Sequence, residues 1–198
     1  DVEMATFDYF RQQPVLQWQW YLQRFASFDG AEPNPAHRAL VALEEWQLER
    51  GGEILLVTQN IDCLHEAAGS RQLVKVHGSS DRVRCIATGC RYAAPSGSLA
   101  RERIDIARFV DNPCSETLPR CPDCGEWLRA HVLFFDEYYT EHDDYRFDTV
   151  QAAASRCEMA LFIGTSFAVG VTELVLRSAL ARRRTVASID PAGLPTGY

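Results

Sequence analysis

Four cysteines in the middle of the chain have a spacing typical of a metal site. Cys85 and Cys90 form a loose pair, and Cys121 and Cys124 form a tight C-x-x-C pair. Two such pairs can surround one tetrahedral Zn²⁺ with thiolates, and four thiolates leave no position open for water. The pattern therefore predicts a structural zinc, with chance clustering of free thiols as the alternative.

The other three cysteines are expected to take no part in that site. Cys114 lies between the two pairs but has no close partner in the sequence, so we interpret it as a spare thiol. Cys63 and Cys157 fall in sheet-forming segments, where a cysteine usually packs as a small apolar residue.

Short polar segments follow three of the expected strands. They are Thr58 to Asp62, His77 to Ser79, and Gly164 to Ser166. Ligands of open parallel sheets bind beyond the carboxyl ends of the strands, so these segments could line one crevice. His77 titrates near neutral pH and could act as a base there. The alternatives are a packed histidine and a simple helix cap made by Asn60 and Asp62.

Tyr21 and Arg24 stand three positions apart in a segment with helical spacing. Residues i and i+3 share one face of a helix. A phenol and a guanidinium on one face can bind a carboxylate. The alternative is an aromatic core helix that ends in a solvated arginine.

The elements that must position these residues follow an alternating order. Apolar spacing predicts two short helices over 8–24, broken near Pro14, and a helix that Asn34 caps and Gly51 ends. Further helices are expected at 61–68, 143–155 and 172–180, and strands at 54–57, 73–76, 131–135, 159–163 and 185–189. Strand–helix–strand alternation at this spacing predicts a parallel sheet.

Composition and charge narrow the class of protein. The chain has 198 residues, of which 46% are hydrophobic and 24% charged, as in ordinary globular domains. A net charge of −7 argues against direct nucleic-acid binding. The sequence shows no membrane-spanning run and no signal peptide, and its seven cysteines are an odd number. We therefore expect a cytoplasmic protein, monomeric and not bound to a membrane.

The motifs together resemble the sirtuin family over nearly the whole chain. The central run Thr58-Gln59-Asn60-Ile61-Asp62, followed by His77-Gly78-Ser79, is similar to the family signature, and the four cysteines come in the expected order after it. The stretch from Leu128 to Glu137 resembles the family's substrate loop, and Gly164-Thr165-Ser166 resembles a later nucleotide loop.

The resemblance implies NAD as cofactor, zinc as structural metal and an acyl-lysine protein as substrate. His77 and Asn60 would be catalytic, with His77 as the base. The residues implied in cofactor binding are Gln59, Asn60, Ile61, Asp62, Gly164, Thr165, Ser166 and Asp190. Those implied in substrate binding are Leu133, Phe135 and Glu137, together with Tyr21 and Arg24, which resemble the Tyr-x-x-Arg pair of sirtuins that remove succinyl or malonyl groups.

Three departures from the family pattern are visible. The opening Gly-Ala-Gly phosphate loop does not occur in these 198 residues, so we expect the true N-terminus to precede Asp1 and this chain alone to bind NAD poorly. Asp136 replaces a glycine of the substrate loop, which predicts a strained backbone and extra negative charge. Asp190 stands where an asparagine is common.

These observations predict an α/β fold with a Rossmann-like parallel sheet, an inserted four-cysteine zinc module and a helical segment. We expect a helical module at 1–33, a discontinuous NAD-binding domain at 34–83 and 128–198, and a zinc module at 84–127. The predicted function is NAD-dependent lysine deacylation, which releases nicotinamide and 2′-O-acyl-ADP-ribose. The acyl group is expected to be acetyl, succinyl or malonyl. The alternatives are NAD glycohydrolysis or ADP-ribosyl transfer, and a non-catalytic zinc-stabilised module.

Overall fold

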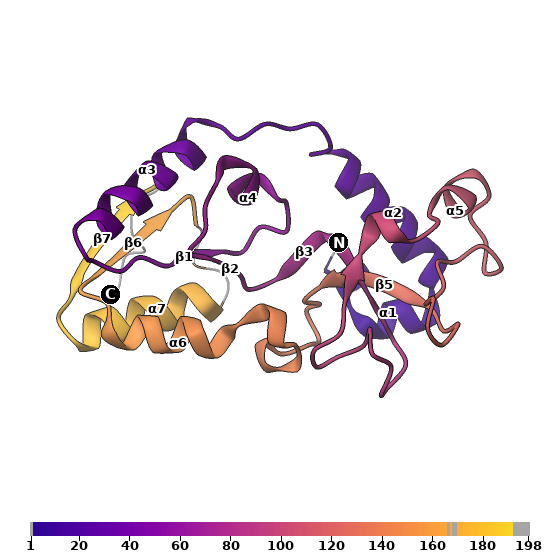
Figure 1. The fold of residues 1–198 in the computed structure, drawn as a ribbon. Coiled ribbons are helices and arrows are strands. Elements are labelled where there is room, and N and C mark those ends of the chain that lie inside the picture. The colour runs from indigo at the N-terminus through magenta and orange to yellow at the C-terminus, as the bar shows by residue number, and fades with distance from the viewer. Residues whose placement is uncertain (1, 166, 168–169, 192–198) are drawn as a thin grey trace. The chain divides into compact units, whose positions relative to one another are not determined.

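The computed structural model describes residues 2–165, 167 and 170–191. The chain divides into two compact units, Asp1–Arg146 and Phe147–Tyr198, and each is considered by itself (Figure 1). The predicted modules, with boundaries after residues 33, 83 and 127, were drawn from sequence motifs, whereas the two units are separated by their contacts. The predicted modules stay a prediction.

Unit 1 holds the longer series of elements. In chain order these are η1 (Glu3–Ala5), α1 (Phe7–Gln12), α2 (Pro14–Ala26), α3 (Pro35–Glu49), β1 (Leu56–Thr58), α4 (Leu64–Ala68), β2 (Leu73–Lys75), β3 (Gly78–Cys85), β4 (Leu99–Ala100), η2 (Arg101–Arg103), α5 (Ala107–Asp111), β5 (Leu128–Val132), η3 (Tyr139–Glu141) and η4 (Asp143–Tyr145). Unit 2 holds α6 (Phe147–Arg156), β6 (Met159–Ile163), α7 (Gly170–Ala181) and β7 (Thr185–Ile189).

The helices at the start of the chain form as their sequences predict. Pro14 begins α2 and separates it from α1, because proline suits a first turn but not a helix interior. Asn34 caps α3 by accepting hydrogen bonds from the N–H groups of Ala36 and His37. The His37 ring accepts the N–H of Asn34 in return, so this histidine has a structural role at the helix start.

The described strands form three small sheets. β1 pairs with β2 in parallel, and β6 pairs with β7 in parallel over its full length, as predicted. Between them in sequence, β4, β3 and β5 form an antiparallel sheet in that order. The sequence did not predict β3, because its residues Gly-Ser-Ser-Asp-Arg-Val-Arg-Cys lack an alternation of apolar and polar types.

Several predicted boundaries were wrong. The strand expected at 131–135 is β5, three residues earlier, because the chain turns at Phe134, whose carbonyl accepts the N–H of Glu137. The strand expected at 54–57 begins at Leu56, and the helix expected at 61–68 begins at Leu64. The helix expected at 143–155 is the short η4 followed by α6, because Arg146 adopts a positive φ of 45° between them.

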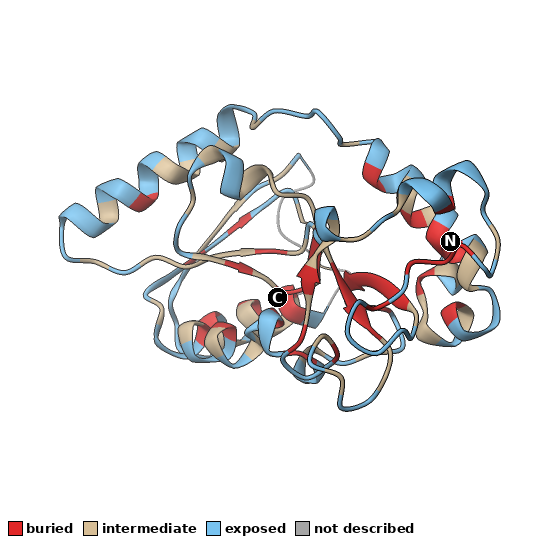
Figure 2. Ribbon diagram, turned by 45° about the vertical axis from the view of Figure 1, so that its right-hand side comes forward, coloured by how far each residue is buried: buried red, intermediate tan, exposed pale blue. Residues whose placement is uncertain are grey.

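The main hydrophobic core lies between the first two helices and the antiparallel sheet. Figure 2 shows buried residues concentrated in β3, β5 and the helix faces toward them, whereas α3 is mostly exposed. Trp18 is 2% exposed, and its indole N–H donates to the carbonyl of Leu128 at 2.8 Å. The core thus ties α2 to β5, the strand that opens the predicted substrate loop.

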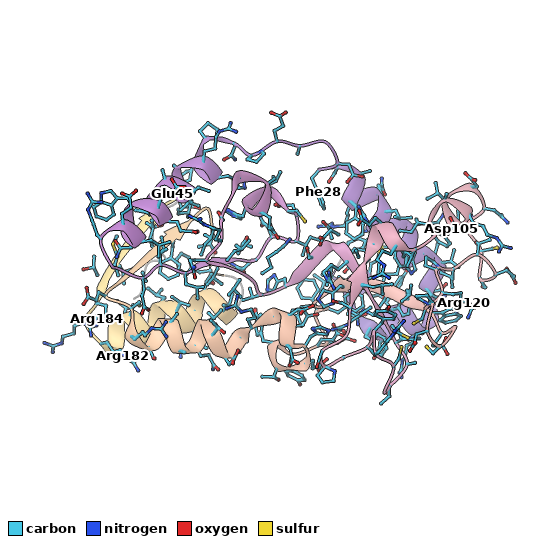
Figure 3. All side chains as sticks on the ribbon, in the orientation of Figure 1. Phe28, Glu45, Asp105, Arg120, Arg182 and Arg184 are labelled. Atoms are coloured by element: carbon cyan, nitrogen blue, oxygen red, sulfur yellow. The ribbon has the colours of Figure 1, made fainter. Side chains whose placement is uncertain are left out.

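The inserted segment between β3 and β5 extends this core. Phe109 and Leu118, both almost fully buried, join the same hydrophobic cluster as Cys85 and Cys121. Figure 3 shows Asp105 and Arg120, which belong to this segment, beyond α2 and β5 at one end of unit 1.

Unit 2 has a small core of its own. Ala160 and Phe162 of β6 pack with Leu176 and Ala179 of α7, while the alternate positions of β6 are exposed. Arg182 and Arg184 lie at the end of α7 (Figure 3). Among the residues that the structure describes, no helix combines the length and apolar character needed to cross a membrane.

Candidate active site and zinc cluster

Two of the three predicted polar segments meet at the carboxyl ends of β1 and β2. The N–H of Val76 donates to the carbonyl of Thr58 at 3.1 Å, and the N–H of Ser80 donates to the carbonyl of Ile61 at 2.8 Å. The residues on either side of segment 77–79 are therefore bonded to segment 58–62, so the two segments lie together, as their positions after neighbouring parallel strands predicted.

The His77 ring is held in one orientation. Its Nδ1 lies 3.0 Å from the backbone carbonyl of Gln59 and its Nε2 lies 3.2 Å from the hydroxyl of Tyr139. A carbonyl only accepts, so Nδ1 carries the proton and Nε2 has the lone pair. Burial lowers the pKa of His77, and the bond to Gln59 offsets this in part. His77 is thus a neutral imidazole with Nε2 able to accept a proton.

Gly78 allows the segment after His77 to lie against β5. Its φ is +83°, and a Cβ at this position would collide with the carbonyl oxygen of His131. Only glycine meets both conditions without strain. The Leu133 N–H donates to the carbonyl of His77 at 3.0 Å, which fixes the start of the predicted substrate loop next to the histidine.

The remaining residues of the 58–62 segment combine local structure with accessible groups. Thr58 is buried, and its hydroxyl accepts the N–H of Asn60 at 3.1 Å. Asn60 is exposed, and Gln59 and Ile61 are half-buried. Asp62 accepts the N–H of Leu64 at 3.0 Å, a turn just before α4, whose N-cap is Cys63 and has no side-chain cap bond.

The substrate loop is braced by a buried ion-pair group. Glu137 contacts Arg84 at 2.7 Å and also pairs with Arg129, and it accepts the N–H of Phe134 at 2.9 Å. Burial would raise the pKa of Glu137, but Arg129 and Arg84 outweigh it and hold that pKa below its usual value. Glu137 therefore holds the conformation of the loop, and it would affect a bound substrate only by positioning the loop.

Phe135 of this loop is a large apolar side chain that faces solvent. It is 68% exposed, and its N–H donates to the carbonyl of Ala5 at 2.9 Å. The N–H of Leu133 is already bonded to His77, so a backbone contact from Leu133 to a substrate would use its carbonyl oxygen.

Asp136 does not have the strained backbone that was expected. Among described residues other than glycine, a positive φ occurs at Arg146, Phe167 and Arg183, and not at Asp136. Its carboxylate accepts the N–H groups of Phe7, at 2.7 Å, and Asp8, at 3.1 Å, at the start of α1. The aspartate thus joins the substrate loop to the first helix, which sequence spacing could not reveal.

Tyr21 and Arg24 lie on α2 in different surroundings. Tyr21 is 4% exposed and stacks on Phe134 at 5.8 Å between ring centres. Burial raises the pKa of Tyr21, and the charges of Arg129 and Arg24 act in the opposite direction. Arg24 is exposed, with its guanidinium carbon 4.5 Å from the centre of the Trp20 ring.

The predicted nucleotide-loop residues belong to unit 2. Gly164 has a φ of +56° and donates its N–H to the carbonyl of Ile189 at 3.1 Å. Thr165 accepts the N–H of Phe167 through its hydroxyl at 3.4 Å. Asp190 follows β7, and Ser166 lies outside the described residues.

The four predicted cysteines come together at the end of β3. Their sulfurs all lie within 4.8 Å of one another, with Cys85 to Cys124 at 3.5 Å and Cys90 to Cys121 at 3.6 Å. Zn–S bonds of about 2.3 Å in a tetrahedron separate the sulfurs by roughly 3.8 Å, so the arrangement fits zinc. Burial raises the pKa of the Cys90 thiol to about 11 without a metal, so zinc would also supply the charge that favours thiolates.

Glycines form the turns around these cysteines, and the other thiols lie outside the cluster. Gly89, just before Cys90, and Gly125, just after Cys124, have φ values of +80° and +76°, which allow the chain to turn sharply there. Cys114 is not in the cluster and lies 3.4 Å from the Thr117 hydroxyl. Cys63 lies 3.5 Å from the amine of Lys75, a polar neighbour that its expected packing role did not include.

Sequence reasoning missed three residues of this site. Tyr139 contacts His77 across 62 positions, and Arg84 and Arg129 hold Glu137. Arginines in strands usually face solvent, so their burial at 4% and 2% exposure depends on an acid supplied from the loop.

Known proteins resemble this chain in both sequence and fold. The sequence model of the Sir2 family matches residues 1–171. An NAD-dependent protein deacylase of Thermus thermophilus is 35% identical over 98% of this chain and 68% of its own length. The mitochondrial NAD-dependent protein deacylase sirtuin-5 of the dog is 31% identical over 98% of this chain and 64% of its own. A solved Sir2 homologue in complex with NAD superimposes with a TM-score of 0.75 at 33% identity, over 96% of this chain and 66% of that one.

The parallel strand pairs and the cysteine cluster are those of an α/β protein with a zinc-binding insertion, and the relatives identify it as an NAD-using enzyme. The chain belongs to the Sir2 family of NAD-dependent protein deacylases. It spans between about 58% and 72% of the length of the curated relatives it matches.

Proposed function

We propose that the chain carries the base and the acyl-lysine loop of an NAD-dependent protein-lysine deacylase. The observation that supports this most directly is the His77 ring, whose Nε2 has a lone pair beside the substrate loop. NAD supplies the nicotinamide–ribosyl bond whose cleavage provides the acceptor for the acyl group. His77 would remove the proton of the attacking ribose hydroxyl through Nε2.

The residues around His77 have the donors and acceptors that such a reaction needs. Asn60 is exposed and Gln59 is half-buried at the end of β1, and their amides would hold the ribose and a water. Asp62 would accept a hydrogen bond from the nicotinamide amide, with Ile61 packed beside it. In unit 2, Gly164, Thr165, Ser166 and Asp190 would bind the adenosine part.

Product analysis tests this function against its alternatives. The full-length protein is incubated with NAD and an acetyl-lysine peptide, and the products are separated. Deacylation gives 2′-O-acetyl-ADP-ribose that depends on the peptide and is lost in His77→Ala. Free ADP-ribose formed equally without peptide would identify a glycohydrolase, and ADP-ribose attached to the protein would identify a transferase.

We further propose that Tyr21 and Arg24 favour acyl groups that end in a carboxylate. Tyr21 touches Phe134 of the substrate loop, and the positive charges of Arg129 and Arg24 act on its hydroxyl. A carboxylate reaching this place would meet a phenol and a guanidinium.

The ratio of kcat/KM for succinyl-lysine to that for acetyl-lysine measures this preference. Arg24→Met is expected to lower the ratio roughly 10- to 100-fold, because a hydrogen bond to a charged group contributes about 1.5–3 kcal/mol. Arg11→Met is the matched control, since Arg11 is also an exposed arginine beside an aromatic ring, Phe7, on the preceding helix. An equal ratio in both variants contradicts the proposal.

The remaining features of the proposed function concern setting and partners. We infer a cytoplasmic monomer acting on acylated lysines of proteins, which is consistent with the odd number of cysteines and the negative net charge. Light scattering of the purified chain tests the monomer, and a dimer at micromolar concentration would contradict it.

A further inference from the structure

A second group of metal-ligating side chains lies in unit 1, apart from the strand-end site and the cysteine cluster. It consists of His131 on β5, His142 just before η4, and Asp144 within η4. One nitrogen of each histidine and one carboxylate oxygen all lie within 4.8 Å of one another. The Oδ2 atom of Asp144 is 3.2 Å from His131 Nε2 and 3.8 Å from His142 Nδ1.

The His131 ring is buried, and its close contact with Asp144 acts on both side chains but falls outside regular hydrogen-bond geometry. It is 1% exposed, and neither of its nitrogens has a partner in hydrogen-bond geometry. The 3.2 Å contact to Asp144 has the right length but not the direction of an N–H bond. Leaving a polar group unpaired in this way costs about 1–3 kcal/mol, so the ring is in surroundings that favour a further binding partner.

The separations of the three atoms fit a common ion. Zinc binds nitrogen and carboxylate oxygen at about 2.0–2.2 Å, which places tetrahedral ligand atoms roughly 3.3–3.5 Å apart. The distances of 3.2 and 3.8 Å lie on either side of this range. Two histidines and one carboxylate are a donor set that divalent transition metals commonly use.

Outer contacts orient the ligands as they do around known metals. His142 Nε2 donates to the carbonyl of Gly97 at 3.0 Å, which leaves the lone pair on Nδ1, and Ser98 donates to Asp144 at 2.9 Å. The Nδ1 atom accepts the N–H of Asp144 at 3.1 Å, so an ion has to replace a bond that contributes about 1 kcal/mol.

The group is reached from a cavity of unit 1. His131 and Asp144 line a space of about 650 Å³, whose other walls include Lys75, Ser79 and Arg146. An ion could therefore enter from solvent, and a water from the cavity could complete its coordination.

We propose that His131, His142 and Asp144 bind a divalent zinc-type ion as a second metal site, with one position left to water. The ion joins β5 to the segment around η4. Its ligand on β5, His131, lies two residues before Leu133 of the substrate loop. Without an ion, the same side chains would only form a buried polar group around Tyr145, on which His131 stacks at 5.7 Å between ring centres.

Zinc content separates these two cases. The full chain is purified, equilibrated with zinc and dialysed, and zinc is counted by mass spectrometry against protein. About two ions per chain are expected, one for the cysteines and one for this site. Asp144→Asn and His131→Gln are expected to retain about one, whereas Asp143→Asn, an exposed neighbour, retains about two. About one ion in the unaltered chain overturns the proposal.

Cobalt titration gives a second measurement that identifies the ligands. The cysteine cluster gives thiolate-to-cobalt charge-transfer bands, and a nitrogen and oxygen site gives only weak ligand-field bands. The proposal expects a second binding phase without thiolate bands, absent in Asp144→Asn. Asp144 is partly exposed, so this variant is expected to keep its fold, and thermal unfolding checks that it does. A single phase with thiolate bands in the unaltered chain also overturns the proposal.

Discussion

His77 is bound on both ring nitrogens, and the two contacts have different consequences. The carbonyl of Gln59 fixes the proton on Nδ1, whereas the Tyr139 hydroxyl donates to Nε2, the atom that would receive the substrate's proton. Tyr139 therefore stabilises the neutral ring, and it must leave Nε2 when a ribose hydroxyl arrives. The phenol therefore occupies the ring nitrogen through which the proposed base would act.

The pH profile of kcat/KM reports the pKa of His77 in the free enzyme. Burial lowers this pKa from an ordinary value of 6.5, and only the neutral ring acts as a base. Activity should thus persist as pH falls to 6.5 and decline at lower pH. A decline centred above that value, with a folded protein, would contradict the lowered pKa.

Removing the phenol hydroxyl should move this acidic limb upward. Tyr139→Phe deletes a bond that only the neutral ring accepts, so the pKa of His77 should rise. Tyr138→Phe is the matched control, because Tyr138 is 73% exposed. A limb that stays in place in Tyr139→Phe, or moves to lower pH, would show that the contact does not affect the base.

At the scale of elements, Asp136 connects two segments that are far apart in the chain. The N-terminus of α1 has unpaired N–H groups, and the carboxylate of the substrate loop satisfies those of Phe7 and Asp8. The neighbouring Phe135 N–H bonds to Ala5, so the loop and the start of the chain support each other.

Asp136→Ala should lower the free energy of unfolding by about 1 kcal/mol, as loss of a helix cap does. Urea denaturation of the full chain measures it. Asp111→Ala is a control at an exposed acid of α5 and should change the value by less than about 0.5 kcal/mol. Equal stability of the two variants would mean that the loop and α1 are not coupled.

At the scale of the whole molecule, the cysteine cluster belongs to the main core of unit 1. Cys85 and Cys121 pack in the same buried cluster as Trp18 and Leu128. Among the described residues of unit 2, Ala160, Phe162, Leu176 and Ala179 form a buried cluster within that unit. Loss of zinc should therefore weaken unit 1 through the contacts that hold α2 and β5 together.

Cys124→Ser should lower both the zinc content and the thermal midpoint, by an amount equivalent to roughly 3 kcal/mol or more. Cys124 is exposed, so the serine itself disturbs little packing. Calorimetry measures the midpoint, and Cys114→Ser, outside the cluster, is the control. If both variants unfolded at the temperature of the unaltered chain, zinc would not support the core.

The sequence by itself determined the features that depend on spacing along the chain. The cysteine pairs predicted the cluster, Pro14 and Asn34 predicted helix boundaries, and β6 and β7 were predicted at their observed residues. Segments 58–62 and 77–79 were expected to meet because the ends of parallel neighbours share one edge. Each of these rests on a short-range rule or a specific motif.

Only the tertiary structure decided the contacts between residues distant in sequence. Tyr139 reaches His77, Asp136 caps α1, and Glu137 is paired with Arg84 and Arg129 from β3 and β5. No pattern of residue types marks these pairs, because a polar side chain can be satisfied by water as well as by a partner. Burial removes the water, and the fold then selects which partner each side chain must find.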